Sequence, residues 1–327
     1  MRTLATAAVV LSTMLSSAFA HENGTIKVYD SNIGMSAFKP GRLVIDDGKR
    51  AGLFPPKNAA ILYSNLEKIR DYYFQNHNRK SWDDRGADIV ASVNAGKFAF
   101  IDIFGLKQNA AWIHEQNRFV FGVGDKKGLD DFESALDVVA HEYTHAVIQT
   151  TSNLKYEGQS GALNEHFADV FGSLINQHYN RPLRPYTIGS SVLRGPYRAV
   201  AEALRDMMNP ALGLSPQPGS MMELAIVPGY TKYAKGCVPT AQNDLCGVHI
   251  LSGIPNRLSA LIMSKIDRLE ASNLFYNVMT ERLKVNSNFE DYRLALLDEC
   301  KSFSSDVCPA VESAVKVVFN DGLAAFR

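Results

Sequence analysis

The feature that most constrains this chain is a short apolar run that carries two histidines and a glutamate. Residues 138–147 read VVAHEYTHAV, so His141, Glu142 and His145 interrupt a segment whose spacing suits a helix. Four residues make slightly more than one helical turn, which places the two histidines one above the other on the same face. Two imidazoles in this arrangement can occupy two corners of a tetrahedral zinc site, with Glu142 beside them to act on water. The alternative is an ordinary amphipathic helix with solvated histidines.

A second helical segment supplies what the first one lacks. A catalytic zinc needs a third protein ligand and an open position for water. Residues 161–169 read GALNEHFAD, and Glu165 in this segment lies 20 residues after His145. Asp169, four residues further on the same face, can accept the remaining N–H of a ligand histidine and fix its orientation. We interpret His166 as non-catalytic because it points off the ligand face.

Residues 1–20 have the features of a secretory signal peptide. Arg2 supplies an early cation, residues 4–20 carry no charge, and Ala18-Phe19-Ala20 offers a cleavage site of small residues. No later stretch reaches the roughly 18 apolar residues of a membrane span. Lys+Arg and Asp+Glu balance at 34 each, so bulk charge favours neither nucleic acid nor a membrane surface as partner. We expect an exported, soluble protein, secreted to the exterior directly or through a periplasm, that acts as a monomer.

Four cysteines remain in the exported chain. In an oxidising compartment an even number of cysteines favours disulfides, and four cysteines allow three pairings. The short separations suggest Cys237–Cys246 and Cys300–Cys308. A zinc site built from these four residues is the rival interpretation, which the sequence weakens because no pair has C-x-x-C spacing.

The chain up to about Val123 reads as short strands separated by turns. The expected strands lie at 25–30, 88–93, 97–104 and 118–123, and one helix is expected over 57–76. Asn94-Ala95-Gly96 has the composition of a hairpin turn between two of these strands.

From Asp130 onward the pattern becomes helical. Asp131 is expected to begin the motif helix as its N-cap or first-turn acid, and that helix continues to Gln149. Further helices are expected at 160–178, 250–266, 273–284, 288–300 and 308–319. We therefore predict an α+β protein with a β-rich domain, 21–152, that ends in the motif helix, and a mainly α-helical domain, 153–327.

The two helical segments resemble the thermolysin-like neutral metalloproteases. That family has H-E-x-x-H followed, after a loop, by G-A-x-N-E-x-x-x-D, and this sequence has both at the family's spacing. The resemblance implies His141, His145 and Glu165 as zinc ligands, Glu142 as general base and Asp169 behind His141. It also implies the family's two-domain gluzincin fold, with the active-site cleft between the domains.

Other matches extend the resemblance over nearly the whole exported chain. Residues 247–254, GVHILSGI, resemble the family's G-V-H-x-x-S-G-I, which implies that His249 donates to the developing oxyanion. Tyr156 falls where the family has a second oxyanion donor, and Asp244 occupies the place of the carboxylate that orients the histidine. Taken singly, His249 and Tyr156 would have ordinary structural roles, so their weight comes from the combination.

The resemblance also implies how a substrate binds. Arg205 looks like the arginine that holds a substrate carbonyl, and Asn109-Ala110 resembles the strand segment that pairs with the substrate backbone. The apolar pocket for the residue after the scissile bond would be lined by Phe132, Val138 and Leu204. The expected function is a secreted zinc endopeptidase that cleaves proteins or peptides N-terminal to bulky hydrophobic residues, using a zinc-activated water with Glu142 as base.

The sequence departs from the family at its double calcium site. Asp137 is retained there, but the other matching positions hold Asn176, Pro185, Thr187 and Ser190. Calcium requires about six to eight oxygen ligands, which this set serves poorly. We expect the double site to be absent, with the disulfides taking over part of its stabilising role, while a single calcium ion elsewhere stays open.

Two further points stay open at this level. Thr25 already resembles the start of the mature family domain, so we expect almost no room for a propeptide.

The alternatives to an active endopeptidase are a catalytically weak, zinc-bearing secreted binding or effector protein, and a zinc aminopeptidase. The first is opposed by the full set of site residues, and the second by the lack of a motif that would anchor a free amine.

Overall fold

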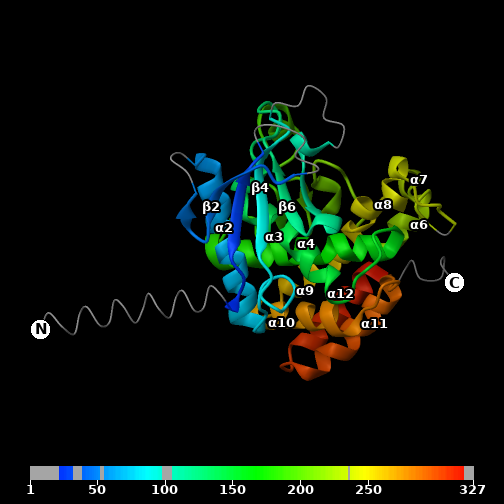
Figure 1. Cartoon of the computed structure of the whole chain (residues 1–327). Coiled ribbons are helices and arrows are strands. Elements are labelled where there is room, and N and C mark those ends of the chain that lie inside the picture. The colour runs from blue at the N-terminus through cyan, green and yellow to red at the C-terminus, as the bar shows by residue number, and fades with distance from the viewer. Residues whose placement is uncertain (1–21, 32–38, 52–54, 98–104, 235, 320–327) are drawn as a thin grey trace, which may run out of the picture.

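We examined the chain in a computed structural model, which describes residues 22–31, 39–51, 55–97, 105–234 and 236–319. The predicted signal peptide lies outside these residues, and so does nearly all of the strand predicted at 97–104. Figure 1 shows a twisted sheet above a pair of long central helices, with the C-terminal helices gathered below and beside them.

The sheet of the N-terminal half has six strands in the order β3-β2-β1-β4-β6-β5. The strands are β1 (Ile26–Asp30), β2 (Arg42–Asp46), β3 (Lys49–Arg50), β4 (Ile89–Ala95), β5 (Ala110–Ile113) and β6 (Arg118–Gly122). β1, β4 and β6 are parallel neighbours, whereas β5 pairs antiparallel with β6 and forms the last described strand on its side. An edge strand has backbone groups free to pair with an extended peptide.

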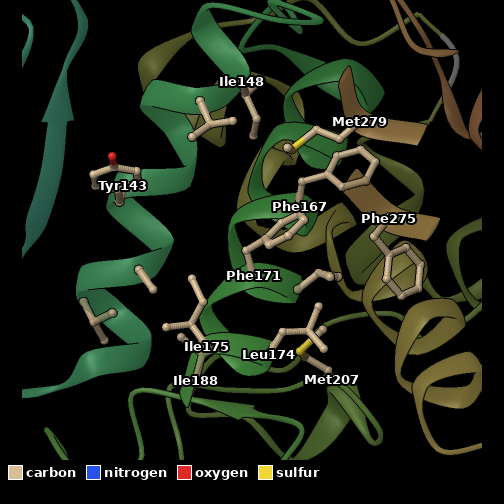
Figure 2. Packing of buried hydrophobic residues seen from close by; sticks show 14 of the residues in the cluster. Tyr143, Ile148, Phe167, Phe171, Leu174, Ile175, Ile188, Met207, Phe275 and Met279 are labelled. Carbon is tan, nitrogen blue, oxygen red and sulfur yellow. The ribbon is translucent and has the colours of Figure 1, made fainter. Parts of the chain in front are cut away.

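Helices α2 (Lys57–His77), α3 (Leu136–Gln149) and α4 (Gly158–Asn180) form the core beside this sheet. α3 and α4 are buried along most of their length and pack against each other. Figure 2 shows α4 between α3, which carries Tyr143, and the C-terminal elements that carry Phe275 and Met279. One buried hydrophobic cluster therefore runs from the sheet into the C-terminal half and holds the two central helices rigidly.

The C-terminal half is helical, as predicted. Its larger helices are α8 (Asp244–Leu251), α9 (Gly253–Met263), α10 (Arg268–Asn277), α11 (Phe289–Glu299) and α12 (Val307–Phe319). Shorter elements are β7 (Thr187–Ile188), β8 (Arg205–Asp206), α5 (Gly195–Val200), α6 (Met221–Ile226), α7 (Pro228–Thr231) and the π-helix η6 (Val278–Arg282). The 3-10 turns of the N-terminal half are η1 (Leu106–Gln108), η2 (His114–Gln116) and η3 (Phe132–Ser134), and those of the C-terminal half are η4 (Pro210–Leu212), η5 (Ala241–Asn243) and η7 (Cys300–Ser302).

Several predicted boundaries were wrong. Asp131 does not begin the motif helix: it precedes η3, and its carboxylate pairs with Lys126, so α3 starts only after Ala135. A turn is present at the expected Asn94-Ala95-Gly96, where the Lys97 N–H donates to the Asn94 carbonyl oxygen at 3.3 Å, but the strand before it ends later than predicted. β4 continues through Ala95 although Asn94 has a positive φ of 61°, and its pairing with β6 is irregular between Ser92 and Ala95. The Asn94 side-chain amide donates to the buried Asp30 carboxylate on β1.

One described stretch, Ala241–Met263, is long and apolar enough to cross a membrane by length and composition alone. Its most apolar window is 72% buried inside the protein, where α8 packs on α4 and α9 packs on α12. Such burial is what a core helix shows, so this stretch is weak evidence for a membrane span.

Candidate active site

Three side chains from the two central helices converge on one point. His141 and His145 come from α3, and Glu165 comes from α4. The two Nε2 atoms lie 3.1 Å apart, and the Glu165 carboxylate oxygens lie 3.5 Å from His141 Nε2 and 3.4 Å from His145 Nε2. Zinc bonds of about 2.0–2.2 Å would place tetrahedral corners roughly 3.3–3.6 Å apart, so these spacings suit a zinc ion.

The hydrogen bonds behind these ligands fix their protonation. His141 Nδ1 donates to Asp169 Oδ1 at 2.8 Å, and His145 Nδ1 donates to Asn164 Oδ1 at 2.7 Å. The Asn164 amide is oriented by its own donation to the Leu154 carbonyl oxygen. In neutral imidazoles the two Nε2 atoms then carry lone pairs that face each other, an arrangement that calls for a cation between them.

The third ligand points to the same conclusion. Glu165 is buried, and its Oε2 atom has no hydrogen-bond partner among the described residues. Burial alone would raise the pKa of Glu165, but nearby positive charge, from His249 first and also from Arg205, lowers it to about 2. The group is therefore a buried carboxylate whose unpartnered oxygen, Oε2, faces His141 Nε2, while Oε1 lies near His145 Nε2. These residues together fit a bound zinc ion.

Asp169 is the centre of the network behind the ligands. Besides His141, its carboxylate accepts hydrogen bonds from Arg205 Nη2 at 2.6 Å, Arg205 Nε at 2.8 Å and Asn256 Nδ2 at 2.8 Å. Burial opposes its ionisation, but the Arg205 guanidinium and His141 hold the pKa of Asp169 well below its usual range. Asp169 thus stays charged, and it fixes both the ligand histidine and the arginine that lines the cleft.

Glu142 lies beside this cluster without joining it. Its Oε2 atom accepts a hydrogen bond from the Trp112 backbone N–H of β5 at 3.0 Å, and the residue lines the cleft. The bond ties the carboxylate to β5, and among the described residues the other oxygen has no hydrogen bond to the three ligands. A carboxylate in this position can exchange a proton with water held near the ligand triangle.

The opposite wall carries two donors. The Tyr156 hydroxyl donates to Glu165 Oε1 and lies 3.2 Å from His249 Nε2, which itself lies 3.5 Å from Glu165 Oε1. His249 Nδ1 lies 2.6 Å from Asp244 Oδ1. Desolvation opposes the charged imidazolium, but Glu165 and Asp244 together raise the pKa of His249 to about 9. The wall therefore offers a hydroxyl donor and a cationic N–H donor beside the ligand triangle.

All these groups border one cleft of about 780 Å³. The predicted substrate residues Asn109, Ala110 and Arg205 line it, as do the predicted pocket residues Phe132, Val138 and Leu204, joined by Ile188. Every residue to which the sequence assigned a role in zinc binding, proton transfer or substrate contact lies in this cleft, and Asp169 and Asp244 lie directly behind it. The disulfides Cys237–Cys246 and Cys300–Cys308 are formed in the structure, and only the first is close to the site.

Three supporting contacts were not found from the sequence. Asn164 stands within the second motif, and its position directly before Glu165 was the available signal for its bond to His145. Asn256 stands two residues after the GVHILSGI segment, but nothing in the sequence indicated that it reaches Asp169. The Trp112 contact uses a backbone N–H, which carries no sequence signal at all.

Family models match nearly the whole chain. The thermolysin metallopeptidase catalytic domain matches residues 4–149, and the thermolysin metallopeptidase alpha-helical domain matches residues 152–319. The chain belongs to the thermolysin metallopeptidase family. The predicted family and the predicted fold, a β-sheet domain followed by a mainly helical one, are thereby confirmed.

Individual members of the thermolysin family support the assignment. Bacillolysin of Bacillus amyloliquefaciens is 33% identical over 280 residues, which cover 85% of this chain and 47% of that protein. Neutral protease NprE of Bacillus pumilus is 32% identical over 280 residues, covering 85% and 82%. The structure titled precursor of protealysin, a metalloproteinase from Serratia proteamaculans, has a TM-score of 0.72 at 28% identity, covering 90% of this chain and 87% of that one. The chain therefore spans about half the length of relatives such as bacillolysin.

Proposed function

We propose that this protein is a secreted zinc endopeptidase that hydrolyses peptide bonds within proteins. The observation that carries the proposal is the ligand triangle of His141, His145 and Glu165, with facing lone pairs and an unpartnered carboxylate oxygen, at the floor of a cleft. Zinc bound there would supply Lewis acidity, which lowers the pKa of water and polarises a carbonyl group. Relatives named extracellular elastase, from Staphylococcus epidermidis, and extracellular metalloprotease, from Pectobacterium carotovorum, support secretion.

The chain's own groups supply proton transfer and charge stabilisation. Glu142, held by the Trp112 N–H, accepts a proton from the attacking water and then delivers it to the leaving amine. Tyr156 and the positively charged His249 donate hydrogen bonds to the oxyanion that develops on the carbonyl oxygen. Asp244 keeps the His249 ring oriented, and Asp169 does the same for His141 and Arg205.

Substrate selection follows from the two walls of the cleft. β5, the last described strand on its side of the sheet, begins at Ala110 directly after Asn109 and offers backbone groups to an extended peptide. Arg205 is available at the cleft to hold a carbonyl of that peptide. Phe132, Val138 and Leu204 form an apolar surface next to the ligand triangle, so a bulky hydrophobic residue is expected immediately after the scissile bond.

The deciding experiment is cleavage-site profiling. Purified protein is incubated with casein and with a peptide library, with and without a zinc chelator. We expect internal cuts before Leu, Phe or Ile, abolished by the chelator and restored by zinc. Removal of single residues from N-termini would favour the aminopeptidase. A folded, zinc-loaded protein that cleaves neither substrate would favour the binding or effector protein.

The calcium expectation has support from the geometry around Asp137. This carboxylate is buried and accepts hydrogen bonds from the backbone N–H groups of Gly189 and Val138, both at 2.9 Å. Ser173 donates to the Pro185 carbonyl oxygen close by, at 2.7 Å. Since protein donors already serve these oxygens, we propose that the family's double calcium site is absent here.

Chelation separates the contributions of the two metals to stability. Protein stripped of metal and reloaded with zinc alone is expected to melt at the temperature of the untreated protein, with no further rise when calcium is added. Recovery of the melting temperature only with calcium would contradict the proposal.

A further inference from the structure

The first residues of α8, which precede His249, do not have right-handed helical geometry but form a left-handed turn that continues the loop before the helix. Asp244, Leu245, Cys246 and Gly247 have φ values of 55°, 49°, 68° and 75° in succession. Only glycine adopts this region freely, because a Cβ atom comes too close to the following carbonyl oxygen. Three consecutive non-glycine residues in this conformation require strong support from their surroundings.

Hydrogen bonds supply part of this support. Asn243 Oδ1 accepts the Cys246 N–H at 3.0 Å, and the Leu245 N–H donates to the Thr240 carbonyl oxygen at 2.9 Å. The Asn243 amide also donates to the Val238 carbonyl oxygen at 2.8 Å. All of these bonds stay within one short loop, so they can hold its shape but cannot anchor it elsewhere.

The Cys237–Cys246 disulfide closes this same loop. Cys246 is the last non-glycine residue of the left-handed turn, and its side chain is buried with 3% exposure. Gly247 follows directly, and a Cβ atom there would lie 2.7 Å from the Tyr233 ring, so that ring packs against the turn. The covalent link fixes Cys246 from one side and the aromatic ring limits movement on the other.

The turn determines where the carboxylate behind His249 lies. Asp244 Oδ1 lies 2.6 Å from His249 Nδ1, and Asp244 Oδ2 accepts the His249 backbone N–H at 2.9 Å. If Cys246 relaxed to a right-handed conformation, the chain direction at Asp244 would change and both bonds would be lost. His249 is about half exposed, and its Nε2 atom lies 3.2 Å from the Tyr156 hydroxyl, so the bonds to Asp244 hold the Nδ1 side of the ring.

We propose that the Cys237–Cys246 disulfide is a positioning element for catalysis. It holds the left-handed turn that sets Asp244 against His249, and so preorganises the oxyanion donor. The inference rests on the proposed endopeptidase function and adds a specific role for one of the two disulfides. Cys300–Cys308, between η7 and α12, has no contact with the cleft among the described residues and provides a matched control.

Three double variants test this role. Cys237→Ser/Cys246→Ser removes the bond, Cys237→Ser/Cys246→Gly removes the bond but allows the left-handed conformation, and Cys300→Ser/Cys308→Ser removes the other bond. We expect about a tenfold fall in kcat for the first, with KM and zinc content unchanged, and recovery of most of that loss in the second. The control is expected to keep the parent kcat per folded molecule. All comparisons are made relative to the parent enzyme, so an inactive parent would count against the proposed function and not against this role.

A double-mutant cycle with His249→Ala tests whether loss of the disulfide lowers kcat by displacing His249. In that background, removing Cys237–Cys246 is expected to cause no further loss of kcat, because the positioned group is gone. An unchanged kcat in Cys237→Ser/Cys246→Ser, an equal loss with the glycine variant, or an additive loss with His249→Ala would each overturn the proposal. Loss of folding in both the serine and glycine variants would also overturn it, since the bond would then hold the fold and not the site.

Discussion

Replacement of Glu142 by glutamine is expected to lower kcat by about 10³-fold while the protein keeps its zinc. Among the described residues that line the cleft, the acidic ones are Glu142, the ligand Glu165 and Glu115. Glutamine has nearly the same shape, and its carbonyl oxygen can still accept the Trp112 N–H. The substitution therefore removes the ability to accept a proton and little else.

Zinc content, melting temperature and KM separate this loss from a structural one. All three are expected to match the parent protein, because Glu142 makes no hydrogen bond or ion pair with His141, His145 or Glu165 in the described part of the chain. Glu312→Gln, at an exposed position of α12, serves as the matched control and is expected to have full activity. Turnover at the parent rate in Glu142→Gln would remove Glu142 from the mechanism.

Two of the three ligands could be predicted from the sequence because they lie close together on one helix. His141 and His145 are four residues apart on one helix, and helix periodicity alone brings them together. Glu165 lies on the next helix, so its place in the site depends on the packing of α3 on α4, which the family resemblance supplied. Residue type and spacing thus identified the groups that would carry the chemistry.

The supporting contacts were harder to predict from the sequence, for a physical reason. The Trp112 N–H is chemically the same as every other backbone N–H, and only the packing of β5 against α3 brings it to Glu142. The left-handed turn at Leu245 and Cys246 involves residue types that normally avoid positive φ. A sequence pattern reports what residues prefer, whereas these features exist because the tertiary structure overrides that preference.

The start of the motif helix also shows that tertiary contacts can override a local sequence preference. Asp131 is a good N-cap type, and its position before an apolar periodic run predicted a helix start. In the structure Lys126 engages its carboxylate, and the chain makes the 3-10 turn η3 before α3 begins after Ala135. The competing ion pair could not be recognised because Lys126 lies before the turn, outside the helical pattern.

Asp169→Asn is expected to have the largest effect on stability, because Asp169 serves a buried arginine as well as a zinc ligand. The carboxylate is fully buried and takes two hydrogen bonds from Arg205, whose side chain is 17% exposed. Removing one partner of such a pair leaves a buried charge uncompensated, which costs about 3–5 kcal/mol of unfolding free energy. Loss of the charged acceptor behind His141 is expected to weaken zinc binding by about 10–100-fold as well.

Asp130→Asn is the matched control, since Asp130 also pairs with an arginine, Arg194, but in an exposed bridge with side chains 27% and 57% accessible. Its loss is expected to cost less than about 1 kcal/mol. Urea denaturation of zinc-free protein measures both variants without the contribution of bound metal. The pKa of Asp169 is held well below its usual range in the folded protein. The stabilising effect of the charged carboxylate is therefore complete above about pH 4, the pKa of aspartate in the unfolded chain, and it is lost as the pH falls towards the lower pKa of the folded state. Equal destabilisation of the two variants at neutral pH would show that the Asp169–Arg205 pair does not organise the site, because a buried pair and an exposed pair can only cost the same if burial adds nothing.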